Sequence, residues 1–182
     1  MDAALGWLGA IVEWFGKFIP RYEIIDTTQG AVKWIGGSKI VTLGPGVHWY
    51  WPFRTKFQAY PTVRQSANLT AQTLVTKDDK TVIIGGLLVY EIKDLEAILA
   101  HTYDPEQTIK DIAATAIQQV IVTKTWDEIK ADSSSGKLAR DLKIMAKREL
   151  DRYGVRVLKA TLTDLATAKV FKLIQSTAID GM

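Results

Sequence analysis

The first hydrophobic pattern along the chain has the period of an α-helix. Over residues 3–19, a stretch of 17 residues, the large apolar side chains recur every three or four positions and fill one half of a helical wheel. Glycine and charged residues fill the other half. Such a helix is about 26 Å long, which is shorter than the ~30 Å hydrocarbon core of a bilayer. The segment therefore predicts an amphipathic helix that lies in a membrane interface or dips partway into it.

This helix carries several large rings on its apolar side. Trp7, Trp14 and Phe18 favour contact with lipid, because aromatic side chains concentrate where hydrocarbon meets the headgroup layer. The alternative is that the same side packs on the protein's own sheet or on a neighbouring subunit. The residues that we expect to face lipid are Leu5, Trp7, Leu8, Ile11, Trp14, Phe15 and Phe18.

Between residues 22 and 93 the pattern changes to short runs rich in β-branched and aromatic residues, which is typical of strands. Gly85 and Gly86, inside the last run, predict a bulge or a close backbone approach. The segment as a whole predicts an antiparallel sheet. The expected strands cover residues 22–27, 31–35, 39–43, 48–51, 56–61, 65–75 and 81–92, with turns at 29–30, 36–37, 44–46 and 77–80.

The turn at residues 44–46 leads directly into four aromatic residues. Successive side chains of a strand point to opposite faces, so these rings cannot all enter one core. The rings on the outer face must meet either a protein partner or the headgroup layer of a membrane. We predict that Trp49, Tyr50, Trp51 and Phe53 form a second membrane contact.

The signals beyond residue 93 are helical. Asp104 followed by Pro105 is the signature of a helix start, and apolar residues then repeat at three and four positions to about residue 123. Residues 126–129 predict a short turn, and residues 132–136 predict a polar loop.

Ser135 is expected to cap a further helix over residues 137–153, which Gly154 ends by taking a positive φ. A strand over 155–165 is expected to join the earlier sheet, and residues 166–179 predict a last helix. A helix of about 14 residues is marginal in water unless its apolar side is covered. We therefore expect a neighbouring subunit to contact Val170, Leu173 and Ile174.

The composition limits the classes of function that the sequence supports. Residues 1–65 carry seven basic and four acidic residues, which accounts for the whole net charge of +3, and this basic excess beside aromatic residues suits an anionic membrane leaflet. No basic run indicates nucleic acid. The chain has no cysteine, and its two histidines, His48 and His101, lie among apolar or helix-forming residues. We expect no catalytic site, no metal and no cofactor.

Four segments in this order resemble the SPFH or band 7 family of stomatins, prohibitins, flotillins and their bacterial relatives. The segments are GPGVHWYWPF, LVTKDDKTVIIGGLLVYEIKD, DPEQTIKDIAATAIQQVIVTKTWDEI and RYGVRVLKATLTDL. The resemblance covers residues 22–165. It implies a small antiparallel sheet packed with helices, an N-terminal membrane attachment, assembly of many copies into rings or cages, and no enzymatic activity.

The chain also departs from that family. Members usually continue into a long heptad helix, whereas only about 15 residues follow the last expected strand, too few for a stable coiled coil. Many relatives have a spanning helix where this chain has an amphipathic segment, and Asp79 stands in a hairpin turn where glycine is common. We therefore expect a minimal form without the long coiled coil.

These observations predict an α+β fold, a small antiparallel sheet packed with helices and preceded by an N-terminal amphipathic helix. Residues 1–20 form that helix, 21–165 the SPFH/band 7-like domain and 166–182 a short C-terminal helix.

The predicted function is a homo-oligomeric scaffold on the cytoplasmic face of a membrane. Its partners are membrane lipid, copies of itself and possible membrane-protein clients, without nucleic acid. The alternative is a soluble regulatory module that co-assembles with a host SPFH protein or binds a protein through its N-terminal apolar helix.

Overall fold

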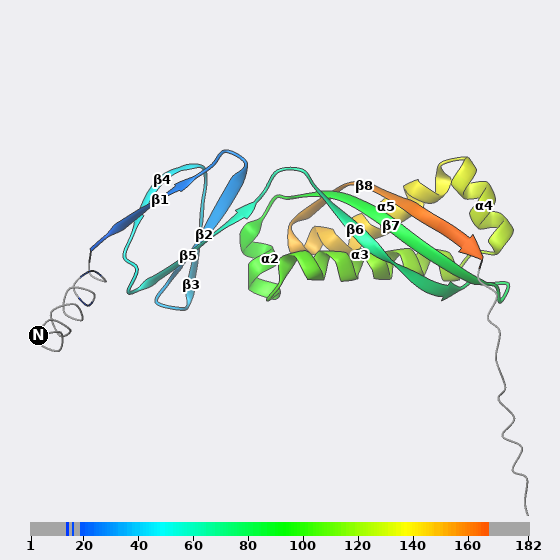
Figure 1. Ribbon diagram of the computed structural model, residues 1–182, viewed down its shortest axis with the longest axis horizontal. Helices are drawn as coiled ribbons and strands as arrows, with labels where there is room; N and C mark the ends of the chain where they lie inside the picture. Colours follow the sequence, from blue (N-terminus) through cyan, green and yellow to red (C-terminus); the bar gives the residue numbers. More distant parts are fainter. Residues whose placement is uncertain (1–13, 15, 17–18, 168–182) are drawn as a thin grey trace, which may run out of the picture.

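The computed structural model describes residues 14, 16 and 19–167, which form two β-rich units along the longest axis of the molecule (Figure 1). The smaller unit contains strands β1 to β5. The larger unit contains strands β6 to β8 and helices α2 to α5. Trp14 and Gly16 are helical, and the other residues of the predicted N-terminal helix, except Ile19 and Pro20, lie outside the described part of the chain.

The smaller unit consists of a three-stranded antiparallel sheet in the order β3-β2-β5 and a two-stranded ribbon of β1 and β4. Tyr50 at the end of β4 stacks on Phe57 of β5, with ring centroids 5.6 Å apart, so the ribbon packs against one face of the sheet. The strands are β1 (Arg21–Ile25), β2 (Gln29–Ile35), β3 (Lys39–Leu43), β4 (Gly46–Tyr50) and β5 (Thr55–Pro61).

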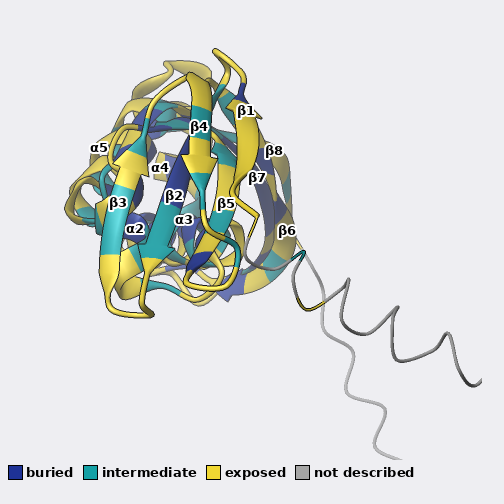
Figure 2. Cartoon of the chain, turned by 90° about the vertical axis from the view of Figure 1, so that its left-hand side faces the viewer, coloured by how far each residue is buried: buried dark blue, intermediate teal, exposed yellow. Residues whose placement is uncertain are grey.

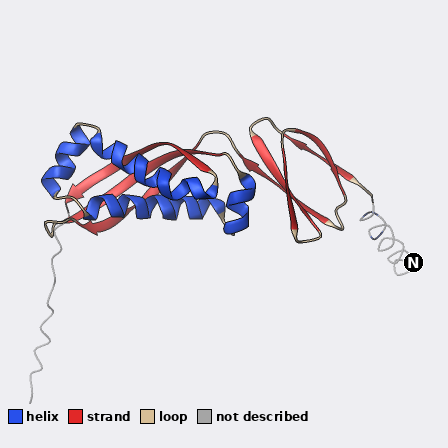
Figure 3. Ribbon diagram, turned by 180° about the vertical axis from the view of Figure 1, so that it is seen from behind, coloured by secondary structure: helices blue, strands red, loops and turns tan. Residues whose placement is uncertain are grey.

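The larger unit is an antiparallel sheet in the order β6-β7-β8, and its helices lie across one face of it (Figure 3). Every second side chain of β7 is buried beneath α3 and α5. The strands are β6 (Gln65–Val75), β7 (Thr81–Ile92) and β8 (Val155–Thr167). The helices are α2 (Leu95–His101), α3 (Pro105–Val122), α4 (Trp126–Ser134) and α5 (Lys137–Leu150), and a 3-10 turn (Asp151–Tyr153) follows α5.

This architecture confirms the predicted α+β class. The bounds of β6 and β7 agree with the predicted strands, and β8 pairs with β7 as expected. The register between β7 and β8 shifts between Gly85 and Gly86, which confirms the predicted bulge. The side chain of Asp104 accepts a hydrogen bond from the backbone N–H of Gln107 at 3.1 Å, so it caps α3 as predicted.

The turn predicted at residues 29–30 is wrong. β2 already begins at Gln29, and the turn lies at residues 27–28, where the N–H of Gln29 donates to the carbonyl of Asp26 at 3.0 Å. Gly30 instead allows a close approach, because a Cβ there would lie 2.7 Å from the Leu95 side chain of α2. The missing side chain lets the smaller sheet pack closely against the larger unit.

The predicted turn at 126–129 and loop at 132–136 are also wrong, because α4 runs through most of both. Thr125 and Glu128 form a capping box that starts α4: each residue's side chain accepts a hydrogen bond from the other's backbone N–H. Ser135 ends α4 instead of capping α5, whose N-cap is Gly136 at a φ of 72°. Helix α2 was not predicted.

Two further boundaries differ from the prediction. β4 is Gly46–Tyr50, which begins two residues and ends one residue earlier than expected, so Trp51 lies in the following loop. Residues 166 and 167 continue β8, whereas the predicted last helix otherwise lies outside the described residues.

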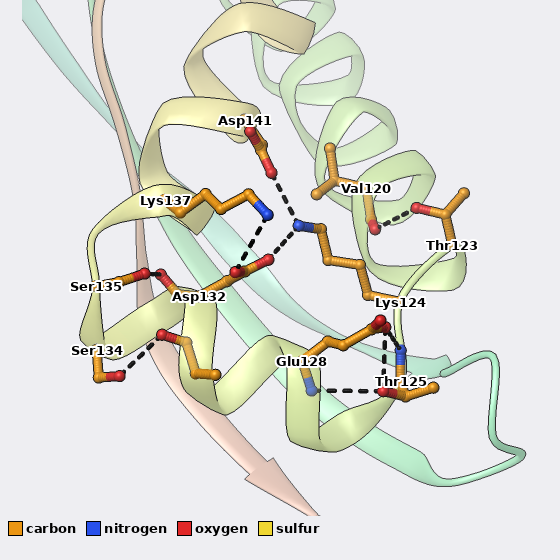
Figure 4. A network of polar contacts seen from close by, with 11 residues as sticks. Val120, Thr123, Lys124, Thr125, Glu128, Asp132, Ser134, Ser135, Lys137 and Asp141 are labelled. Carbon is orange, nitrogen blue, oxygen red and sulfur yellow. Dashed lines mark hydrogen bonds and ion pairs between the residues drawn. The ribbon is translucent and has the colours of Figure 1, made fainter.

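A lysine between two carboxylates fixes the corner of α3, α4 and α5 (Figure 4). The ammonium of Lys124, whose side chain is largely buried, binds Asp132 of α4 and also Asp141 of α5, the latter at 2.8 Å. These contacts raise the pKa of Lys124, with the hydrogen bond to Asp132 as the largest cause and that to Asp141 next. The buried cation therefore stays charged and ties the two helices to the end of α3.

The turn between β6 and β7 is joined to the same corner by Asp78. Its carboxylate accepts hydrogen bonds from the Thr76 hydroxyl at 2.7 Å and from the N–H of Trp126 at 3.0 Å, and it pairs with Lys80 at 2.9 Å. The Thr76 hydrogen bond, followed by those from Lys80 and Trp126, lowers the pKa of Asp78 well below its usual range. Asp78 therefore stabilises the turn and the start of α4 more strongly in its ionised form.

The first prediction concerns Gly154, which joins α5 to β8 at a φ of 69°. A Cβ there would lie 2.5 Å from the Cβ of Asp94 and 2.8 Å from its carbonyl oxygen. We expect Gly154→Ala to lower the free energy of unfolding by about 3 kcal/mol, from left-handed backbone and steric overlap together. Gly136→Ala is the matched control: its φ is 72° with nothing within 4 Å, so about 1 kcal/mol should be lost. Equal losses in urea unfolding would contradict this account.

The second prediction concerns acid stability. The folded-state pKa of Asp78 is lowered, so its contribution is present above the unfolded value of about 3.9 and is lost as the pH falls below it. Asp78→Asn should therefore lower stability at pH 7 and flatten its decline between about pH 5 and pH 2. Asp79→Asn is the matched control, because it removes a carboxylate from the same turn and keeps the contacts of Asp78 with Thr76, Lys80 and Trp126. Chemical denaturation across that pH range measures both, and parallel curves for wild type and Asp78→Asn would refute the role.

Candidate membrane-facing surface

One face of the β1-β4 ribbon is apolar and points away from the protein. The register pairs Tyr22 with Trp49 and Ile24 with Val47, so these four side chains share one face, which we call the ribbon face. All four are exposed, Tyr22 to 60% and Trp49 to 65%. The rings of Tyr22 and Trp49 lie 5.7 Å apart between centroids, at an interplanar angle of 58°.

The opposite face of the ribbon explains this exposure. Ile25, on that face, is only 2% exposed, and Tyr50 rests on Phe57. Strands that cover a sheet usually carry apolar residues inward and polar residues outward. Here the outward face is the apolar one, whereas Arg21 and Glu23 lie on the other face with Ile25. Contiguous exposed apolar surface marks a site that contacts a partner or a membrane.

The smaller unit carries a second group of exposed apolar residues at one end. We call this end the tip. The pairing of Arg21 with Tyr50 and of Ile35 with Thr55 brings the start of β1, the loop after β4 and the turn after β2 to this end. The N–H of Gly36 donates to the carbonyl of Arg54 at 3.0 Å and joins the two loops. The exposed apolar residues of the tip are Ile19, Ile35, Trp51 and Phe53.

The tip and ribbon face lie far from the end of β8. In Figure 1, β1 begins at the outer end of the smaller unit, and β8 ends at the opposite end of the long axis. Viewed from the side of the smaller unit, β1 and β4 are mostly exposed and β3 is partly exposed, whereas β2 carries buried residues (Figure 2).

Positive charge accompanies the apolar residues. No Asp or Glu occurs between Thr27 and Lys77, a stretch that contains six Lys or Arg residues. The ammonium of Lys33 lies 3.4 Å from the carbonyl oxygen of Trp49, and the guanidinium of Arg54 lies 6.0 Å from the ring centroid of Phe53. Basic residues beside exposed aromatic residues are suited to an anionic lipid surface.

Among the predicted contact residues, Trp14, Trp49, Trp51 and Phe53 are exposed. Tyr50 is half-buried on the inner side of the ribbon. The structure therefore separates Tyr50 from the other rings. The predicted residues outside the described part of the chain are Leu5, Trp7, Leu8, Ile11, Phe15, Phe18, Val170, Leu173 and Ile174.

Sequence reasoning missed Tyr22, Ile24, Ile35 and Val47. Their signal was present: Tyr22 and Ile24 alternate with Arg21, Glu23 and Ile25, and this two-residue period puts the two apolar residues on one face of the strand. The acid-free stretch was a second signal, because six basic residues without a carboxylate between them leave that surface positive.

The described residues do not support a metal site or a membrane-spanning helix. Residues 14, 16 and 19–167 contain no cluster of His, Cys, Asp and Glu that could hold a metal ion. None of the helices within those residues has the length and apolar character needed to cross a bilayer. The exposed apolar surface and its basic residues are therefore the candidate functional site.

Comparison with known proteins agrees with the fold. The family described as SPFH domain / Band 7 family matches residues 23–179. An uncharacterized protein of Methanocaldococcus jannaschii is 25% identical over 144 residues, which cover 78% of this chain and 70% of that protein. Mouse stomatin is 21% identical over 149 residues, 82% of this chain and 50% of stomatin, and stomatin-1 of Caenorhabditis elegans is 23% identical over 79% of this chain and 43% of its own length. Because the family match spans most of the chain, the protein belongs to the SPFH domain / Band 7 family.

Proposed function

We propose that this protein is a membrane-associated, homo-oligomeric scaffold that contacts lipid through the ribbon face, the tip and the N-terminal amphipathic helix. The observation that carries the proposal is the ribbon face, four exposed apolar side chains on a ribbon whose other face packs on the sheet through Ile25 and Tyr50. A folded domain gains nothing by leaving Tyr22 and Trp49 in water. The headgroup layer covers their apolar parts and still hydrates the phenol and indole polar atoms.

The orientation follows from the positions of the two described ends. β1 begins at the tip, and β8 ends at the other extreme of the long axis. With the tip toward the bilayer, on its cytoplasmic face, the segment after β8 begins far from the membrane. That segment is then free to contact neighbouring copies and membrane-protein clients that stand above the surface.

Assembly is proposed to use the segment after residue 167. Its apolar residues Val170, Leu173 and Ile174 lie on one side of a helix in projection. Copies packed side by side in a closed ring meet through heterologous contacts, so a change to one patch weakens every junction. The function needs no catalytic residues, and the similar stomatins are themselves proteins of this family.

Removal of the ribbon-face rings tests the membrane contact. Each ring presents ~150–250 Å², so a half-inserted ring contributes about 2 kcal/mol. The double variant Tyr22→Ser and Trp49→Ser should lower the partition coefficient onto lipid vesicles by on the order of 1,000-fold, with unchanged circular dichroism. Tyr103→Ser with Ile144→Ser is the matched control, because both residues are exposed and lie on the larger unit.

Equal vesicle binding by the folded double variant and wild type would rule out the ribbon face as a lipid contact. If wild type itself does not bind vesicles, the soluble interaction module replaces the membrane scaffold.

Charge substitution tests the assembly. Val170→Glu with Ile174→Glu should convert a large species into monomers or small oligomers, because two carboxylates cannot be buried unpaired at a subunit contact. Ala168→Glu with Gln175→Glu adds the same charge to the opposite side of the projected helix and should leave the assembly intact. Light scattering coupled to size-exclusion chromatography measures both, and a monomeric wild type in lipid and detergent would defeat the scaffold proposal.

A further inference from the structure

We propose that a groove at the tip binds the headgroup of an anionic phospholipid, with Arg54 and Lys56 as the cations that hold its phosphate. The inference rests on the proposed membrane attachment and names the lipid class and the residues that select it. The groove has a volume of about 910 Å³, within the ~300–1,000 Å³ usual for small-molecule sites. Its walls include Trp34, Phe53, Arg54, Lys56, Phe57 and Gln58.

The backbone fixes the position of Arg54 within this groove. Its N–H donates to the carbonyl of Trp51 at 3.2 Å, and its own carbonyl accepts from the N–H of Gly36 at 3.0 Å. The guanidinium lies over the Phe53 ring at 6.0 Å from the centroid. A guanidinium held on a short turn keeps several N–H donors available for phosphate oxygens.

Lys56 lies on β5, two residues after Arg54. It is the cross-strand partner of Trp34, so the two side chains leave the sheet on the same face. None of the residues that line the groove is acidic. In the described part of the chain neither Arg54 nor Lys56 forms an ion pair, so no protein carboxylate competes for the two cations.

The composition of the groove favours a lipid over other anions. Phe53, which is 57% exposed, belongs both to the groove and to the apolar residues of the tip, beside Trp51. A ligand that fits both parts has an anionic group for Arg54 and Lys56 and an apolar portion for the two rings. A phospholipid combines them, whereas nucleic acids are bound through many phosphate contacts along a strand.

The position of the groove agrees with this assignment. It opens between the turn after β2 and the loop after β4, at the end where residue 19 enters. In the orientation proposed above, this end reaches the headgroup layer. The indole and phenyl rings then lie at the depth of the upper acyl chains, and the cations lie at the depth of the phosphates.

Vesicle binding by the full chain tests the groove. The wild type and the double variant Arg54→Gln with Lys56→Gln are measured on vesicles of phosphatidylcholine and on vesicles in which part of it is replaced by phosphatidylserine. The wild type should bind the anionic vesicles more tightly, and the double variant should lose about 30-fold of that gain while it binds phosphatidylcholine as before. Arg64→Gln with Lys77→Gln is the matched control, because it removes two basic residues of the same acid-free stretch outside the groove.

The outcomes separate this inference from the proposed function. Tight binding by wild type to both kinds of vesicle without preference would overturn the headgroup site and leave the membrane scaffold in place. Failure of wild type to bind any vesicle would overturn the scaffold itself. Equal losses in the two double variants would mean that net charge, not the groove, attracts the anionic lipid, and the site would be rejected.

Binding of a short-chain lipid tests whether the groove binds a whole lipid or its headgroup phosphate alone. Dihexanoyl phosphatidylserine, below its micelle concentration, should shift the indole N–H resonances of Trp34 and Trp51 in nuclear magnetic resonance spectra. Glycerophosphoserine, which has the same headgroup without acyl chains, should shift them only at much higher concentration. Equal affinity for the two ligands, or for polyglutamate, would reject a lipid as the occupant.

Discussion

The packing of the β1-β4 ribbon on the smaller sheet determines which side chains the protein presents at its surface. Tyr50 rests on Phe57 and Ile25 is buried, so the two-residue period of the strands turns Tyr22 and Trp49 outward. A shift of one residue would exchange the faces, bury Trp49 and expose Ile25 and Tyr50. The exposed rings are therefore a consequence of a fixed register and not of loose packing.

The larger unit gives this ribbon a rigid support. A single buried core includes Val32 of β2 together with residues of β7, α3 and α5, so the two units share their interior. The close approach of α2 to Gly30 and the pairing of the Lys93 and Asp94 N–H groups with the carbonyl of Gly154 connect the sheets to the helices around them. Because these joints are packed or hydrogen-bonded, a contact at the tip fixes the orientation of the whole described chain.

The sequence predicted the larger unit better than the smaller one, for physical reasons. β6 and β7 are long and alternate regularly, and Asp104 with Pro105 marks the start of α3 unambiguously, so their bounds agree with the structure. Helix α4 buries only Ile129, so its apolar period is too weak to detect, although Thr125 and Glu128 form a capping box. Gly30 was misread as a turn residue because close packing against Leu95 involves a residue far along the chain.

The candidate site was predictable in kind but not in detail. The run of aromatic residues after the turn identified Trp49, Trp51 and Phe53, because so many rings cannot enter a single core. The inward packing of Tyr50 depends on Phe57, and the pairing of Tyr22 with Trp49 depends on a strand 27 positions away. Contacts of this kind follow from the tertiary register, which residue types along a single segment do not specify.

In the proposed scaffold, attachment and assembly reinforce each other. Exposed rings and two or three basic residues give each copy a modest affinity for a bilayer, but copies joined in a ring bind as one multivalent particle. Once one copy is bound, its neighbours meet the membrane at a high effective concentration, so the ring stays attached even though single contacts dissociate quickly. By thermodynamic linkage the reverse also holds, because a surface that binds the assembled ring more tightly than the monomer favours assembly. An amphipathic helix, an apolar ribbon face and a basic groove of individually weak affinity are therefore sufficient for a protein that works as many copies on one surface.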